Sequence, residues 1–87
     1  MKVYCVIECD FRTSETVLKS VFSTFKKAMD LCKLSANERV KRYSQTREVE
    51  ERKDGYIVWY KEEGDIEKDD NSNMMCMYYV KEKLVIN

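Results

Sequence analysis

Histidine and proline are both absent from this chain of 87 residues, which also has only two glycines. Without histidine, the chain lacks the most common general base and the most common zinc ligand, and it can form no Ser-His or Cys-His nucleophile pair. Two glycines are too few for a glycine-rich loop that binds phosphate. These absences predict a protein that is not an enzyme and uses no cofactor.

Long apolar runs are missing as well. No stretch approaches the roughly 20 apolar residues that cross a membrane, and no apolar segment follows a basic start as in a signal peptide. Hydrophobic residues make up 44% of the chain and charged residues 37%, with 16 basic and 16 acidic side chains. We therefore expect a single domain over residues 1–87, located in the cytoplasm and away from membranes.

Apolar periodicity predicts the order of the elements. Residues 2–9, 17–22, 56–62 and 74–86 read as strands, the last as one long strand or two short ones. Residues 46–52 could extend a helix, but we favour a strand. Asp54-Gly55 indicates a hairpin turn, in which glycine can adopt a positive φ. Residues 10–16 and 64–73 read as polar connections.

One amphipathic helix is expected from Phe25 onward, with Ser23 or Thr24 as its N-cap. Its apolar positions lie within about a third of the circumference at 3.6 residues per turn: Phe25, Ala28, Met29, Cys32, Ala36, Val40 and Tyr43. The fold class is therefore α+β. We expect a mainly antiparallel sheet of four to five strands, in the order β-β-α-β-β-β, with the helix on one face.

The four cysteines raise the question of a metal site or a disulfide. Cys5 and Cys9 lie four residues apart on a strand, which separates them by about 13 Å and prevents both from binding one zinc ion. Cys32 and Cys76 are isolated. In a reducing compartment, buried cysteine acts as a small apolar side chain, so we expect free thiols and no metal. A calcium loop at Asp69–Asn73 fails because the glycine and glutamate of that motif are absent.

Charge is distributed unevenly along the chain. Residues 16–47 carry eight basic and two acidic side chains, whereas residues 48–70 carry four basic and ten acidic ones. The acidic stretch could imitate the phosphates of a nucleic acid, and the basic helix exterior could instead contact real ones. The candidate acidic interface is Glu62, Glu63, Asp65, Glu67, Asp69 and Asp70. The candidate basic face is Lys26, Lys27, Lys33 and Lys41.

Several expected strands are apolar on both faces, although one helix can cover only one face of a sheet. An uncovered apolar face rich in Tyr, Trp and Met is typical of an interaction surface. The candidate apolar interface is Tyr4, Trp59, Tyr60 and Tyr79. The aromatic strand around Trp59 also suggests RNA stacking, but Ile57 occupies the position where the RNA-recognition motif has a small residue. A homodimer or a complex with another protein would cover this face, unless the C-terminal segment does so.

Two short motifs in the N-terminal third of the chain resemble those of other small proteins. Lys2-Val3-Tyr4 and Val6 form a KVY-V strand, and the segment from Val21-Phe22-Ser23 to Lys26-Lys27-Ala28 forms a strand-to-helix junction. Together they resemble small proteins encoded by phages and mobile elements of Gram-positive bacteria. The resemblance transfers no site residue. It implies a context in which small proteins bind and block host defence proteins, including CRISPR effector nucleases, within the host-cell cytoplasm.

We therefore expect a non-catalytic, phage-type interaction protein, such as an anti-CRISPR, that binds a host protein and blocks its access to nucleic acid. The acidic stretch would occupy a basic nucleic-acid channel, with Trp59 or a neighbouring tyrosine as the anchor. The alternatives are a nucleic-acid-binding module that uses the basic helix face, and a dimer that sequesters a small ligand.

Overall fold

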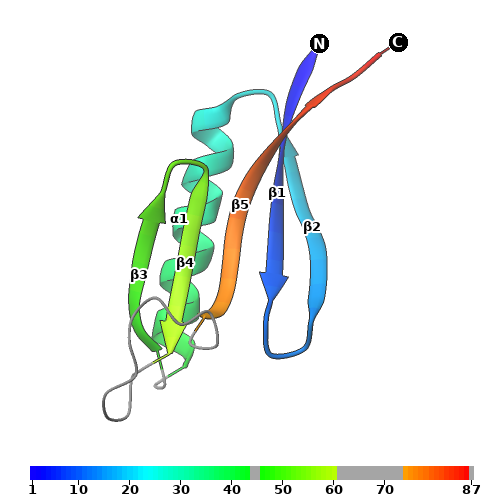
Figure 1. Ribbon diagram of the computed structural model, residues 1–87. Coiled ribbons are helices and arrows are strands. Elements are labelled where there is room, and N and C mark those ends of the chain that lie inside the picture. Colours follow the sequence, from blue (N-terminus) through cyan, green and yellow to red (C-terminus); the bar gives the residue numbers. More distant parts are fainter. Residues whose placement is uncertain (44–45, 61–73, 87) are drawn as a thin grey trace.

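The computed structural model describes residues 1–43, 46–60 and 74–86. One helix packs across one face of a five-stranded antiparallel sheet (Figure 1), which confirms the expected α+β class and element order. In chain order the elements are β1 (Lys2–Asp10), β2 (Glu15–Phe22), α1 (Phe25–Arg42), β3 (Thr46–Arg52), β4 (Gly55–Tyr60) and β5 (Met74–Leu84). Residues 46–52 are thus a strand, and the C-terminal segment forms one long strand.

The strands lie in the order β2-β1-β5-β4-β3. Two hairpins, β1 with β2 and β3 with β4, therefore flank β5, which pairs with β1 on one side and β4 on the other. On the β1 side, Val6 lies opposite Val80, and Glu8 lies opposite Tyr78. Because side chains alternate between the two faces of a strand, this register brings the even-numbered residues of β1 and β5 together beneath α1.

Thr24 begins the helix as one of the two expected N-caps. Its Oγ1 accepts a hydrogen bond from the backbone N–H of Lys27 at 3.3 Å, which satisfies one of the free donors in the first turn. The last turn carries Arg39, Lys41 and Arg42, basic side chains that are favourable at the negative end of the helix dipole.

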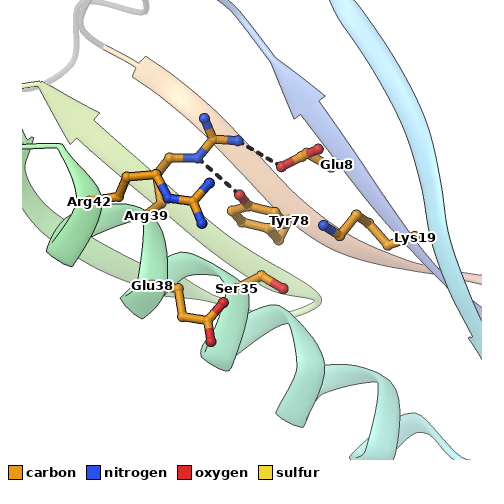
Figure 2. Close-up of a pocket in the computed structure, with 7 residues that line it drawn as sticks. All are labelled: Glu8, Lys19, Ser35, Glu38, Arg39, Arg42 and Tyr78. Carbon is orange, nitrogen blue, oxygen red and sulfur yellow. Dashed lines mark hydrogen bonds and ion pairs between the residues drawn. The ribbon is translucent and has the colours of Figure 1, made fainter.

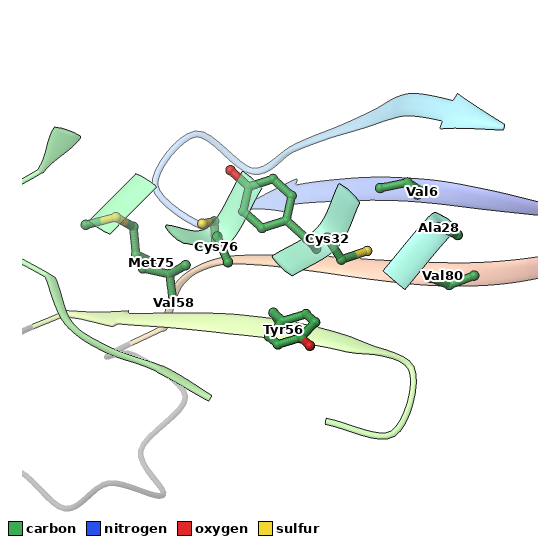
Figure 3. Close-up of a cluster of buried hydrophobic side chains, with 10 residues drawn as sticks. Val6, Ala28, Cys32, Tyr56, Val58, Met75, Cys76 and Val80 are labelled. Carbon is green, nitrogen blue, oxygen red and sulfur yellow. The ribbon is translucent and has the colours of Figure 1, made fainter. Parts of the chain in front are cut away.

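The core lies between α1 and the central strands (Figure 3). Ala28, Cys32 and Ala36 are the buried residues of α1, and these small side chains allow the helix to approach the sheet closely. The largest fully buried side chains are Met75, Val6, Val58, Cys32 and Cys76. Phe25, at the start of the expected apolar stripe, remains 43% exposed, although its ring packs edge-on against Tyr4.

Gly55 has a different role from the one predicted. The two turn residues are Lys53 and Asp54, and Gly55 is the first residue of β4, paired with Arg52. A Cβ atom at position 55 would lie 2.2 Å from the carbonyl oxygen of Tyr78 and 2.7 Å from Cα of Tyr79. Glycine is therefore required for the close approach of β4 to β5. The described non-glycine residue with a positive φ is Ser14, at 60°, in the turn between β1 and β2.

Candidate functional site

The sheet face that points away from α1 is here called the open face. On β1 it carries Val3, Cys5 and Ile7, all half-buried, and on β2 it carries Leu18, which is 59% exposed. On β5 it carries Met77 and Tyr79, which are also half-buried. The sequence predicts an apolar second face, and the described residues on β1, β2 and β5 place apolar side chains there.

A groove of about 390 Å³ lies on the β2-β1-β5 part of the open face. Cys5, Ile7 and Leu18 supply its apolar lining, and Thr16, Lys81 and Lys83 supply its polar lining. The strand register explains this composition, because Cys5 pairs with Lys81, and Ile7 pairs with Leu18. The groove therefore offers an apolar surface with two cations beside it.

The four residues of the predicted apolar interface do not form one surface. Tyr4 packs on the helix side, against Phe25. Trp59 is only 3% exposed, and its Nε1 donates a hydrogen bond of 3.0 Å to Glu50 Oε2. Tyr79 is the member that lies half-buried on the open face, and the side chain of Tyr60 is outside the described residues.

Burial of Tyr56 and Trp59 also bears on the RNA interpretation. Tyr56 is 8% exposed and belongs to the core beneath α1, and Trp59 is buried on the other face. Neither ring presents a free face on which a base could stack. Tyr56 and Trp59 thus contribute to packing.

Of the two predicted charged surfaces, the basic face lies within the described residues and the acidic interface lies outside them. All four lysines of the basic face, Lys26, Lys27, Lys33 and Lys41, are exposed on α1, and Lys26 forms an ion pair of 3.1 Å with Asp30. The six acidic residues between Glu62 and Asp70 lie outside the described residues, as does the Asp69–Asn73 stretch.

All four cysteines are free thiols, with Cys5 and Cys9 half-buried and Cys32 and Cys76 buried. Burial raises the pKa of both Cys32 and Cys76 to about 11. Within the described ranges, no group of three His, Cys, Asp or Glu side chains is placed to hold a metal ion. Among these same residues, no helix has the length and apolar character needed to cross a bilayer.

A polar pocket of about 120 Å³ lies on the helix side of the sheet and was not anticipated from the sequence (Figure 2). Arg39 lines this pocket. Its Nη2 donates a hydrogen bond of 2.7 Å to Glu8 Oε1, and its Nε donates one of 3.1 Å to the Tyr78 hydroxyl. Lys19 of β2 and Ser35, Glu38 and Arg42 of α1 complete the lining.

Charged neighbours extend this network toward the β1–β2 turn. Arg39 Nη1 lies 3.7 Å from Asp10 Oδ2, and Arg12 donates to the same carboxylate at 2.9 Å. The guanidinium groups of Arg12 and Arg39 lie 4.8 Å and 5.4 Å from the centre of the Tyr43 ring. The ring thus adds cation–π contacts to the ion pairs.

Ionisation of the network follows from these contacts. Burial raises the pKa of Glu8, but the hydrogen bonds with Tyr78 and Arg39 outweigh it and hold the pKa below its ordinary value. Hydrogen bonding from Arg12 likewise lowers the pKa of Asp10. Burial and the contact with Glu8 raise the pKa of Tyr78. At neutral pH the network therefore contains charged carboxylates and a neutral phenol.

One sequence signal could have revealed Arg39 as an inward-facing residue. It lies three positions after Ala36 and four before Tyr43, so helical spacing places it on the apolar side. Glu8 similarly shares the face of Tyr4 and Val6 on β1. A single charged side chain beneath a helix is unusual, but Glu8 and Arg39 compensate each other as an ion pair.

The chain matches no family model, and neither the curated proteins nor the solved structures contain a match to it. Any assignment of function therefore depends on the surfaces and pockets described above.

Proposed function

We propose that this chain is a non-catalytic interaction protein that binds a partner protein through the groove on its open face. The observation that carries the proposal is the apolar lining of that groove, in which Leu18 is 59% exposed and Ile7 and Cys5 are half-buried. Exposed apolar surface of this kind favours association, because binding removes it from water.

Lys81 and Lys83 define the chemistry of the partner. Both lie beside the groove on β5 and are exposed. A complementary partner surface would carry an apolar side chain flanked by carboxylates. Such a surface would be attracted at long range by the lysines and held at short range by the groove.

The particular form we propose is inhibition of a host defence machine, for example a CRISPR effector nuclease. The resemblance of residues 1–30 to phage-encoded proteins supports this form, as does the acidic composition of residues 62–70. In this mechanism the acidic stretch blocks the nucleic-acid channel of the nuclease, while the open face contributes binding energy.

Leu18→Glu and Leu34→Glu form a matched pair for testing the role of the groove. Leu34 is 56% exposed on α1, so the two changes place the same charge at similarly exposed positions on different surfaces. A purified CRISPR effector nuclease is assayed for DNA binding and cleavage in the presence of each variant. We expect Leu18→Glu to lose inhibition and Leu34→Glu to retain it. Equal activity of the two variants, or no inhibition by the unchanged chain, would overturn the proposal.

Direct nucleic-acid binding is the second candidate, favoured by the exposure of all four lysines of the basic face on α1. A gel-shift assay at two salt concentrations tests it. Binding through phosphate contacts weakens steeply as salt increases, and it should be lost when Lys26, Lys27, Lys33 and Lys41 are changed to Gln. If that variant still inhibits the nuclease fully, the basic face is not the functional surface.

A further inference from the structure

Lys19 and Arg42 enter the polar pocket from different walls. Lys19 comes from β2 and Arg42 from α1, and they lie on either side of Tyr78 (Figure 2). Throughout the described part of the chain, neither side chain has a carboxylate within ion-pair distance. Both side chains are exposed, and an anion bound between them would offset the repulsion between their like charges.

The carboxylates of the pocket neutralise its cations only in part, although Glu8 attracts Lys19 as well as Arg39. Arg39 is already matched by Glu8 at 2.7 Å and by Asp10 at 3.7 Å. The remaining carboxylate, Glu38, is exposed on the helix. Lys19 and Arg42 together therefore exceed Glu38 by one positive charge.

The size and lining of the pocket restrict its occupant. A cavity of about 120 Å³ has room for a single tetrahedral oxyanion. Lys19 and Arg42 offer charged donors, and the hydroxyl of Ser35 offers a neutral one. Glu38 disfavours a long polyanion, because further phosphates would meet its negative charge.

We propose that this pocket binds a small phosphate-type oxyanion between Lys19 and Arg42. The ligand class comprises inorganic phosphate and the terminal phosphate of a small monoester. This site is separate from the groove on the open face, which lies on the opposite side of the sheet.

Titration with sodium phosphate at constant ionic strength tests the site. Binding is detected by isothermal calorimetry and by 31P line broadening. We expect saturable binding by the unchanged chain. Lys19→Gln/Arg42→Gln should weaken it by more than about tenfold, because two charge-assisted hydrogen bonds are lost together. Arg52→Gln/Lys53→Gln is the matched control. It removes one arginine and one lysine at exposed positions of the β3–β4 hairpin, outside the pocket, and should bind phosphate as the unchanged chain does.

Glu38→Gln provides an independent measurement that does not depend on the fold of the double variant. Removal of this carboxylate should tighten phosphate binding several-fold, because it ends a repulsion near the ligand.

Glycerol 2-phosphate in place of inorganic phosphate distinguishes a monoester ligand from the free ion. Non-saturable binding, equal weakening by Lys19→Gln/Arg42→Gln and by Arg52→Gln/Lys53→Gln, or no gain from Glu38→Gln would each overturn the proposal.

Discussion

Arg39 Nη2 lies 2.7 Å from Glu8 Oε1, and this ion pair joins the C-terminal half of α1 to β1. The side chains of Arg39 and Glu8 are only 13% and 17% exposed. The pair is thus largely withdrawn from water. In this buried site, the loss of one partner leaves the other charge without compensation.

Arg39→Met should destabilise the protein by about 3 kcal/mol, because Glu8 would keep a buried charge without its cation. The double variant Glu8→Gln/Arg39→Met should lose less than the sum of the two single changes. Urea unfolding of all four proteins measures this coupling. A cost below about 1 kcal/mol for Arg39→Met would mean that the pair behaves like one on the surface.

Acid should weaken the fold through Glu8 and Asp10. Their pKa values are lower in the folded protein than the ordinary values of 4.5 and 3.8. The unfolded chain therefore binds more protons in this window, and the stabilisation present above pH 4.5 is lost as the pH falls through the folded pKa values. Urea midpoints between pH 3 and pH 7 should show this decline. Glu8→Gln should show a shallower one, and an unchanged slope would exclude Glu8 as a source.

Thiol reactivity should divide the four cysteines into two pairs. Cys32 and Cys76 are buried with pKa values of about 11, so little reactive thiolate forms near pH 8. Cys5 and Cys9 are half-buried on the open face and should react first. Alkylation at pH 8 followed by mass spectrometry should therefore give two early modifications, and four in urea. Early modification of Cys32 or Cys76 would contradict the core packing.

Gly55→Ala should destabilise the sheet by about 3 kcal/mol, because the new Cβ would overlap the backbone of Tyr78 and Tyr79. The opposite sign is expected for Ser14→Gly, since Ser14 has a φ of 60° that glycine adopts without a Cβ clash. That change should be neutral or stabilising by up to about 1 kcal/mol. Thermal unfolding of the two variants would test both expectations. Equal tolerance of the two changes would argue against the close approach of β4 to β5.

Local patterns in the sequence are sufficient to predict much of the fold. The change from alternating to helical periodicity marked the start of α1, and Thr24 has the hydroxyl that an N-cap requires. The turn role predicted for Gly55 is wrong because its actual role depends on Tyr78 and Tyr79 of β5, which lie more than 20 residues further along the chain.

The candidate sites were harder to predict, because they depend on how distant strands align. Burial of Trp59 follows from its position in the assembled sheet, and an aromatic residue in a strand is equally compatible with an exposed surface. The pocket around Arg39 combines residues from β1, β2, α1 and β5. Spacing along the chain indicates the inward direction of Glu8 and of Arg39 separately, but only the register of the sheet brings them together.

The position of β5 between the two hairpins has a consequence for synthesis. A ribosome produces β1, β2, α1, β3 and β4 before the strand that must lie among them, so the two hairpins have no shared partner until residues 74–84 emerge. Lys2 of β1 then pairs with Leu84 of β5, far along the chain. Such non-local pairing slows folding, because a long loop must close before its contacts stabilise it. The final strand therefore controls when the nascent chain becomes a folded protein.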